Sequence, residues 1–274
     1  MTDTEEHDVS GRRFDEKVAW VTGASSGIGR ALARRLYDEG AAVAVSARRE
    51  GKLEEIRAAV DEPERIRVVP VDLTDTAAID RAVDEVRGWR GRVDVLVNNA
   101  GISQRGSAVE TDMATVRQIM ELNFFAPVAL TRALVPGMRR RGDGYLVVVS
   151  SVAGYVATPQ RSTYAASKGA IRLWCDSLRA ELQDTGLSVT VASPGYVATP
   201  ITKHARTEDG SKLDEMQQAQ KEGITPEECA AEIVDAAARR KNETFPGGTE
   251  TWGVTLKRLL PRLTAKLLPK FTPE

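Results

Sequence analysis

The sequence predicts an α/β fold in a single domain, with a doubly wound parallel sheet of six to seven strands and helices on both faces. Three observations support this prediction. Short β-branched runs alternate with longer segments of helical spacing along most of the chain. A glycine-rich turn joins the first run to its helix. No repeat or linker interrupts the alternation, and sequential strand–helix units build a covered parallel sheet.

Composition limits the classes of partner and location. The 274 residues carry 38 Lys and Arg against 39 Asp and Glu, a net charge of −1, which argues against a nucleic-acid partner. Cys175 and Cys229 are too few for a disulfide framework and match no metal site, so no metal is expected. The polar N-terminus shows no targeting signal, and no stretch approaches about 18 consecutive apolar residues. A cytoplasmic location is therefore expected.

The main domain is expected over residues 16–248, after a flexible arm at 1–15. Its first unit is an apolar strand at 17–22, a glycine turn at 23–29 and a helix at 30–39. In this context the glycines let backbone N–H groups approach a pyrophosphate, and the helix N-terminus adds a partial positive charge. A structural turn without a ligand is the alternative.

The second unit favours NADP(H) over NAD(H). A strand at 42–47 is followed directly by Arg48 and Arg49, with no acid, and then by a helix at about 50–60. An acid in this place would hold the ribose 2′-hydroxyl of NAD, whereas an arginine accommodates the 2′-phosphate of NADP. Two solvated surface arginines are the alternative interpretation.

The third unit predicts an adenine contact. Its strand covers 67–71, and Asp72 then lies at the strand end, within reach of an adenine amino group. Asp75 is placed to cap a helix that continues to about residue 88.

The fourth strand, at 93–97, ends in an Asn-Asn-Ala-Gly sequence at 98–101. The pattern from 111 to 141 is then helical, but it is broken around Asn123. An amide of weak helix propensity is unexpected there, so the sequence predicts a local bulge, stabilised by water.

The fifth unit carries the candidate chemistry. Ser151 follows the strand at 145–149, and the next helix, which ends at about 184, holds Tyr164 and Lys168. A spacing of four places these two side chains on one helix face, where an ammonium would pull the phenol pKa down from about 10 toward the working pH. Ser151 would hydrogen-bond a substrate oxygen. Taken alone, the Tyr-x-x-x-Lys pair is a common coincidence.

A sixth strand at 187–192 leads into a loop at 193–200. Residues 201–224 are polar and aperiodic, which predicts a mobile segment closing over the site, with the substrate loop at about 196–224. Thr225 is expected to cap a helix at 226–241. A seventh strand is expected near 244–246.

The tail at 249–274 is basic and amphipathic. Its leucines and Trp252 alternate with lysines and arginines, interrupted by Pro261 and Pro269. Contact with a membrane surface is one interpretation. Packing over the active site or against a partner subunit is favoured, because apolar stripes usually mark buried faces.

Together these motifs resemble the short-chain dehydrogenase/reductase family, in its compact single-domain branch, over roughly residues 14 to 200. In chain order they are TGASSGIG, NNAG, Asn123, Ser151, Tyr164 with Lys168, and the Pro194-Gly195 loop. The resemblance implies a Rossmann fold and a catalytic tetrad. Tyr164 would be the acid/base and Ser151 would orient the carbonyl or alcohol. Lys168 would lower the tyrosine pKa and contact the nicotinamide ribose, and Asn123 would hold a water that links Lys168 to solvent.

The resemblance also implies a set of cofactor contacts. They come from Gly23, Ser25, Ser26, Gly27, Ile28, Gly29, Arg48, Asp72, Leu73, Asn99, Ala100, Gly101, Tyr164, Lys168, Pro194, Gly195, Val197 and Thr199. The serines in the glycine turn weaken the preference for NADP(H), because many NADP-using members carry a basic residue there, and Arg48 keeps it favoured. Gly247-Gly248 stands where many members carry an Asp-Gly-Gly strand end used in tetramer contacts. A homodimer is therefore expected alongside a homotetramer. The tail is weakly similar to those of members that act on lipophilic ketones or alcohols near membranes.

The sequence thus predicts an NADP(H)-dependent oxidoreductase that interconverts a carbonyl and a secondary alcohol of a small molecule, with a lipophilic substrate left open. A catalytically silent NADP(H)-binding scaffold or redox-responsive regulator is the alternative, although all four tetrad residues are present. A nucleotide-sugar epimerase or dehydratase would need a larger C-terminal substrate domain.

Overall fold

The computed structural model describes residues 12–213 and 218–270, and it confirms the predicted fold class. One seven-stranded sheet has the order β3-β2-β1-β4-β5-β6-β7, with every neighbouring pair parallel. The strands are β1 (Val18–Thr22), β2 (Ala42–Ser46), β3 (Ile66–Val68), β4 (Val95–Asn98), β5 (Gly144–Val149), β6 (Leu187–Ala192) and β7 (Glu243–Thr244). The strand order reverses between β1 and β4, and such a reversal opens a crevice at the carboxyl ends of the strands.

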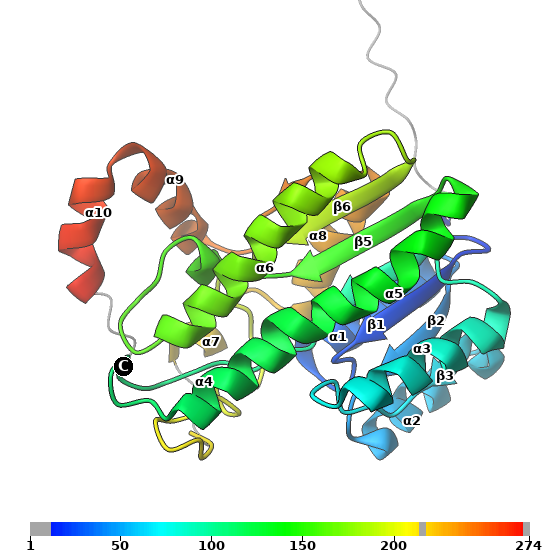
Figure 1. Ribbon diagram of the computed structural model, residues 1–274, viewed down its shortest axis with the longest axis horizontal. Helices are drawn as coiled ribbons and strands as arrows, with labels where there is room; N and C mark the ends of the chain where they lie inside the picture. The colour runs from blue at the N-terminus through cyan, green and yellow to red at the C-terminus, as the bar shows by residue number, and fades with distance from the viewer. Residues whose placement is uncertain (1–11, 214–217, 271–274) are drawn as a thin grey trace, which may run out of the picture.

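Helices cover both faces of the sheet (Figure 1). One face packs against α1 (Gly27–Asp38), α2 (Glu50–Ala58) and α8 (Pro226–Ala238). The other packs against α3 (Thr76–Arg90), α5 (Ala126–Arg141) and α6 (Ser162–Glu181). Each face has its own apolar cluster, as expected for strands that are buried on both sides.

Two helix caps that the sequence predicts are confirmed. The Asp75 carboxylate accepts hydrogen bonds from the backbone N–H groups of Ala77 and Ala78 at the start of α3. Thr225 and Glu228 form a reciprocal capping box at the start of α8, with Pro226 in its first turn. These side chains satisfy backbone donors that helix starts leave without partners.

Two strands end earlier than predicted, each near a proline, and two helices also end early. β3 ends at Val68 rather than at 71, although Val69 and Val71 still donate to the carbonyls of Val45 and Ala47. Pro70 between them has no N–H, so the regular pairing stops. β7 ends at Thr244, ahead of Pro246, whereas the sequence predicts strand near 244–246. The helices α6 and α8 end at Glu181 and Ala238, about three residues early.

The predicted bulge at Asn123 is confirmed as a π-helical turn, Glu121–Phe125, between α4 (Met113–Met120) and α5. The whole stretch Met113–Arg141 is long and apolar enough to cross a membrane by length and composition alone. In the fold, α5 buries Leu130, Leu134 and Met138 in the core beneath α3 and α6, as core helices of this length do.

The described part of the expected flexible arm is docked onto the body. The Phe14 side chain is buried, and its ring contacts that of Tyr145 edge-on at 5.4 Å between centroids. Arg13 pairs with Glu39 at the end of α1. The docked domain therefore includes residues 12–15, whereas residues 1–11 lie outside the described part of the chain.

Candidate active site

The glycine turn after β1 builds a cradle of backbone. Gly23 and Gly27 have φ angles of 68° and 54°, a region that favours glycine. A Cβ on Gly29 would lie 2.3 Å from the Gly23 carbonyl oxygen, so only glycine fits there. α1 begins at Gly27, and its N-cap Ser26 makes no side-chain cap bond. The N–H groups of this helix start therefore face the cleft without a side-chain acceptor, as an anion site requires.

Asn99 and Thr22 join the ends of β1 and β4. The Thr22 hydroxyl accepts from the backbone N–H groups of Asn99 and Ala100, at 3.0 and 3.1 Å. The Asn99 amide donates to the Thr22 carbonyl at 2.9 Å. Asn99, predicted as a cofactor contact, thus also fixes the width of the cleft at the point where the strand order reverses.

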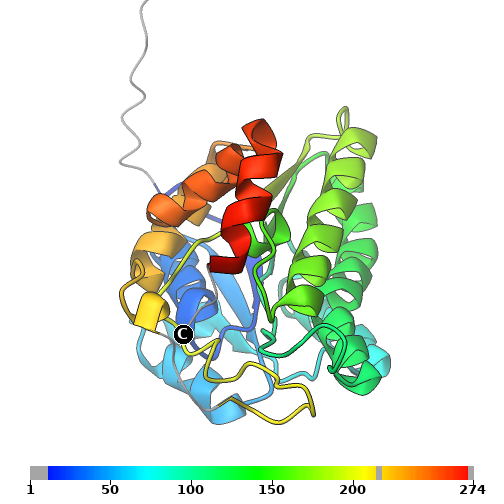
Figure 2. The same ribbon diagram turned by 90° about the vertical axis from the view of Figure 1, so that its left-hand side faces the viewer.

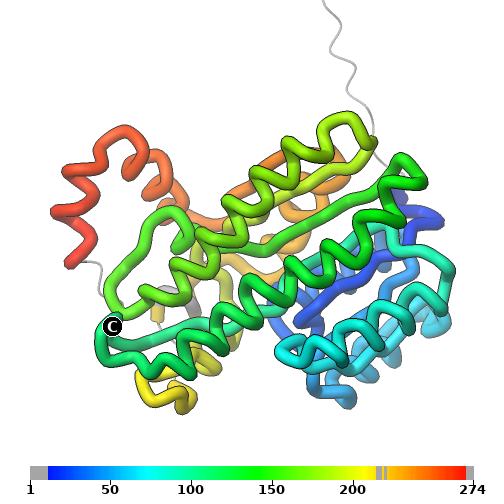
Figure 3. The backbone as a smooth tube through the Cα atoms, in the orientation of Figure 1, coloured from blue at the N-terminus to red at the C-terminus, as the bar shows by residue number. Residues whose placement is uncertain are grey.

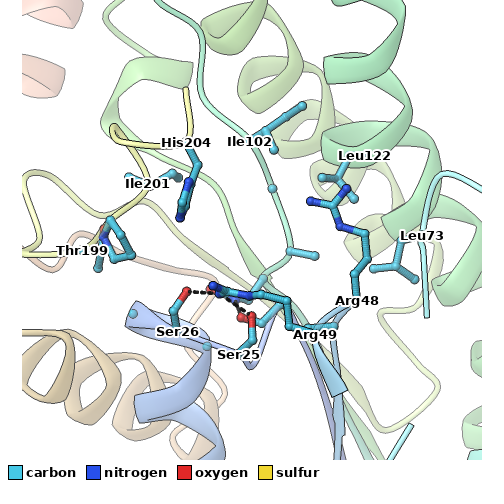
Figure 4. A pocket seen from close by; sticks show the side chains of 18 of the residues that line it. Ser25, Ser26, Arg48, Arg49, Leu73, Ile102, Leu122, Thr199, Ile201 and His204 are labelled. Atoms are coloured by element: carbon cyan, nitrogen blue, oxygen red, sulfur yellow. Dashed lines mark hydrogen bonds between the residues drawn. The ribbon is translucent and has the colours of Figure 1, made fainter. Parts of the chain in front are cut away.

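One cavity lies along this carboxyl edge (Figure 4). The predicted cofactor residues that line it are Gly23, Ser25, Ser26, Gly27, Ile28, Gly29, Arg48, Asp72, Leu73, Asn99, Ala100, Gly101 and Thr199. Those that do not are Tyr164, Lys168, Pro194, Gly195 and Val197. Lining residues not predicted as cofactor contacts include Arg49, Ile102, Leu122, Ile201, His204 and Arg206. Within residues 12–213 and 218–270, no three His, Cys, Asp or Glu side chains gather as metal ligands would.

The two arginines after β2 take different directions. Arg49 lies over the glycine turn, where its guanidinium donates to the Ser25 hydroxyl at 3.0 Å (Figure 4). Arg48 points to the other side, toward Leu73 and Leu122. Both arginines follow the strand in the sequence, but the family resemblance implies a cofactor contact only for Arg48. The structure therefore adds Arg49 as the arginine beside the serines.

Asp72 lies next to Leu73 on the cavity wall, and its contact with an adenine amino group stays a prediction. Burial raises its pKa, but hydrogen bonds from Thr74 and the charge of Arg48 outweigh burial and hold the pKa below its ordinary value. The carboxylate is thus ionised at neutral pH and can accept a hydrogen bond from an amino group.

Asn123 is held by the backbone of the neighbouring loop. Its side-chain oxygen accepts from the Ile102 N–H at 2.9 Å, and its amide donates to the Ile102 carbonyl and the Ser167 hydroxyl, both at 3.0 Å. The π-helical turn moves this side chain out of the helical register and toward α6. A Cβ on Gly101 would lie 3.1 Å from the Asn123 oxygen and 3.3 Å from the Lys168 ammonium, so Gly101 lets the two side chains approach.

Lys168 is buried, with 5 % of its surface exposed. Its ammonium donates to the Val149 carbonyl at 2.8 Å, and it lies 6.0 Å from the centre of the Tyr164 ring. Burial lowers its pKa to about 8. The Ser150 hydroxyl donates to the Lys168 carbonyl at 2.9 Å, which ties the end of β5 to α6.

Tyr164 lies beside Ser151, as the tetrad requires, but its pKa departs from the prediction. Burial raises the pKa of the phenol above its ordinary value, and a hydrogen bond from Ser151 and the charge of Arg161 lower it only in part. The predicted lowering by Lys168 is therefore wrong for the chain by itself. With a pKa of about 8, Lys168 is still mostly protonated at neutral pH, so the burial of the phenol, and not a loss of the lysine charge, sets the direction of the shift.

Gln104 supports the catalytic helix, and the sequence carried no signal for it. Its side-chain oxygen accepts from the backbone N–H groups of Thr163 and Tyr164, at 2.8 and 3.3 Å, and its amide donates to Thr111 at 2.8 Å. α6 has no side-chain cap from its own N-cap residue, Arg161. Gln104 supplies that acceptor from another loop, a role that no local pattern reveals.

The loop after β6 connects the site to the C-terminal region. The Val152 N–H donates to the Pro194 carbonyl at 3.0 Å, and the Glu250 carboxylate accepts from the Tyr196 N–H at 2.8 Å. Arg206 forms isolated bridges with Gln104 and Lys212, so the described part of the predicted substrate loop has defined backbone contacts. Its mobility stays a prediction, and residues 214–217 lie outside the described part.

Comparisons with known proteins agree with this geometry. The model of the family described as short chain dehydrogenase matches residues 17–210. The chain is 38% identical over 265 residues to dehydrogenase/reductase SDR family member 7B of Xenopus tropicalis, covering 93% of this chain and 85% of that protein. It is 40% identical over 241 residues to dehydrogenase/reductase SDR family protein 7-like of Anopheles gambiae, covering 85% and 76% of the two chains.

Solved structures show the same fold. A short-chain dehydrogenase from Streptomyces avermitilis matches with a TM-score of 0.78 and 34% identity, over 92% of this chain and 95% of that one. A short chain dehydrogenase/reductase from Burkholderia phymatum in complex with NAD matches with a TM-score of 0.80 at 23% identity, over 96% and 98%, and thus shows the fold alone. With the family model covering most of the sheet and the site, the chain belongs to the short-chain dehydrogenase family of oxidoreductases.

Proposed function

We propose that this dehydrogenase/reductase uses NADP(H) to interconvert a carbonyl and a secondary alcohol of a small molecule, with Tyr164 as the acid/base. NADP(H), when bound, supplies or takes the hydride. The protein supplies the remaining parts: a cradle for the diphosphate, two arginines for the 2′-phosphate and a buried group that moves the proton.

The convergence of Ser151, Tyr164, Lys168 and Asn123 behind Gly101 carries this proposal. Gly101 lines the cavity, and a Cβ at this position would lie 3.1 Å from the Asn123 side-chain oxygen and 3.3 Å from the Lys168 ammonium. The cluster thus adjoins the cleft where a nicotinamide dinucleotide would lie in this fold.

The raised pKa of Tyr164 suits proton donation. Because burial holds the phenol protonated at neutral pH, Tyr164 can give its proton to a carbonyl oxygen as the carbon receives a hydride. Ser151, which hydrogen-bonds the phenol, is placed to orient that oxygen. Oxidation of an alcohol uses the same atoms in reverse and requires the phenolate.

The cofactor preference rests on Arg48 and Arg49. Both are exposed beside the cleft, and Arg49 already contacts the Ser25 hydroxyl. Arginine binds phosphate through paired charge-assisted hydrogen bonds, and no acid stands after β2 to hold a ribose 2′-hydroxyl.

Tyr164→Phe tests the proposal. The variant should lose about 10²- to 10⁴-fold in NADPH-dependent turnover of a panel of ketones, because only the proton donor is removed. NADPH binding, followed by fluorescence of the reduced nicotinamide, should be unchanged. Tyr155→Phe is the matched control, since its hydroxyl binds Glu243 at 2.6 Å instead of Ser151.

The alternative, a silent NADP(H)-binding scaffold, makes the opposite prediction. Wild-type protein that binds NADPH but turns over no ketone or alcohol in the panel would contradict the oxidoreductase mechanism. Equal activity of Tyr164→Phe and wild type would contradict the role of Tyr164.

A further inference from the structure

The C-terminal tail forms a helical hairpin at the site end of the molecule. α9 (Trp252–Leu259) and α10 (Pro261–Leu267) pack against one another. Figure 1 shows them beside the body, at the end toward which the arrow of β5 points, and in Figure 2, which views the molecule from that end, they lie in front of it. The backbone tube in Figure 3 shows the same hairpin connected to the body through a single short segment.

The hairpin exposes large apolar side chains. Trp252 and Leu259 are each 71% exposed, Leu260 is 50% exposed and Leu263 is 45% exposed. Within residues 12–213 and 218–270, these four side chains thus stay 45% or more exposed, and their packing against a partner subunit stays a prediction. A continuous group of exposed leucines with a tryptophan is unusual on a soluble surface, and such groups mark interaction sites.

The same hairpin is uniformly cationic. It carries Lys257, Arg258, Arg262 and Lys266, and residues 251–270 contain no acidic residue. Lys257 donates to the Tyr155 carbonyl on the body. For Arg258, Arg262 and Lys266, no carboxylate of the described residues lies within 4.0 Å. Their charge is local, because the whole chain has a net charge of −1.

We propose that α9 and α10 are a docking surface for an anionic lipid bilayer. Short amphipathic helices with a basic polar side and tryptophan or leucine on the other side lie in the interfacial plane of a membrane. Anionic headgroups attract each cation near the surface, while the exposed leucines enter the acyl boundary.

Charge complementarity favours a lipid surface over a second copy of the hairpin. In a symmetric dimer the same patch meets itself, so a contact between two hairpins would bring their arginines and lysines together. An anionic bilayer satisfies the apolar and the cationic side chains at the same time.

Docking would also orient the active site. The Glu250 carboxylate at the base of the hairpin accepts from the Tyr196 N–H, three residues before Thr199, where the chain joins the cavity wall. Lys257 contacts the segment that follows Ser151. A bound hairpin therefore turns the carboxyl edge of the sheet toward the lipid, where a lipophilic substrate would be found. This last consequence rests on the proposed function, whereas the docking does not.

Vesicle co-sedimentation of the full chain tests the docking. The probes are vesicles of phosphatidylcholine alone and of phosphatidylcholine with phosphatidylserine. We expect clear binding to the anionic vesicles, weak binding to the neutral ones, and a loss of binding as salt rises. The variant Arg258→Gln/Arg262→Gln/Lys266→Gln should bind the anionic vesicles about 100-fold more weakly. Leu259→Ser/Leu263→Ser should also lose binding, with all charges retained.

The matched control removes as many cations from another helix, α5. Arg132, Arg139 and Arg140 are exposed on α5, and Arg132→Gln/Arg139→Gln/Arg140→Gln should bind vesicles as wild type does. Circular dichroism and NADPH binding should be unchanged in every variant, because the substituted side chains are exposed. These readouts separate a failure of docking from a failure of the proposed reaction.

Three outcomes would overturn the proposal. Equal binding to neutral and anionic vesicles, or unchanged binding by the triple hairpin variant, would show that the hairpin does not recognise an anionic surface. Concentration-dependent self-association that is lost in Leu259→Ser/Leu263→Ser, without vesicle binding by wild type, would assign the hairpin to a second copy of the chain.

Discussion

The candidate cofactor cleft and the candidate catalytic cluster lie side by side but are built differently. In the cleft, Arg48 and Arg49 are exposed and the two serines of the glycine turn are only partly covered. In the cluster, Asn123, Tyr164 and Lys168 are 1%, 6% and 5% exposed. The cluster is already bonded to the backbone carbonyls of Ile102 and Val149 and to the Ser167 hydroxyl. The cleft is thus open to a ligand, whereas the cluster is assembled by folding itself.

Because of this difference, substitutions in the two regions should affect stability and ligand binding differently. Side chains in the cluster satisfy buried backbone groups, so their removal should harm stability and activity together. Side chains in the cleft face solvent, so their removal should change ligand affinity alone. The three predictions below test this separation, starting with the largest effect.

Asn123→Ala should be the most damaging change. It leaves the partly buried N–H and carbonyl of Ile102 and the buried Ser167 hydroxyl without this partner, which should cost about 2–4 kcal/mol of unfolding free energy. Turnover should fall together with stability. Urea denaturation and ketone reduction measure the two effects. Ser25→Ala, the matched change in the cleft, should stay within about 0.5 kcal/mol of wild type. Equal losses in both variants would contradict the separation.

Lys168 should give the protein an alkaline stability signature. Its pKa is about 8 in the folded chain against an ordinary value of 10.5, so the unfolded chain holds this proton when the folded chain has lost it. Between these two values the contribution of Lys168 to stability rises with pH, by up to about 1.4 kcal/mol per pH unit. The difference in unfolding free energy between wild type and Lys168→Met, measured by denaturant titration across this window, reports it. Parallel pH curves would show that the folded pKa of Lys168 is not lowered.

Arg49→Ala should have the smallest effect, and it should be confined to the cofactor. Removing a charge-assisted contact to a phosphate should raise the KM for NADPH about 10-fold. The KM for NADH and the melting temperature should stay constant, because the arginine is exposed and supports no buried group. Arg48→Ala provides the comparison, since Arg48 points toward Leu73 instead of Ser25. A larger rise in the KM for NADPH in Arg48→Ala than in Arg49→Ala would instead assign the main phosphate contact to Arg48, as the family resemblance implies.

Much of the fold and the identity of the cluster followed from local patterns. Apolar runs separated by helical spacing predict a parallel sheet, and the glycine turn, Asn123 and the Tyr164–Lys168 pair each have a signal within a few residues. The predicted ends of β3 and β7 were less accurate, although Pro70 and Pro246 in the sequence indicate where these strands stop.

What the sequence did not reveal depends on contacts between distant segments. Gln104 supports α6 across about sixty positions, and no residue near it indicates this. The pKa of Tyr164 depends on how deeply the fold buries it, which spacing alone does not give. The hairpin has a pattern typical of buried helices, yet Trp252, Leu259 and Leu263 stay exposed among the described residues.

The π-helical turn at Glu121–Phe125 has a further consequence for how the chain can change. Such a turn holds one residue more than an α-helical turn, and one residue corresponds to about 100° of rotation about a helix axis. Deleting a single residue there would restore a regular α-helix. Either Asn123 would then turn away from α6, or the buried stripe of Leu130 and Leu134 would turn away from the core. The extra residue therefore lets one continuous helix direct Asn123 toward α6 and still bury Leu130 and Leu134 in the core.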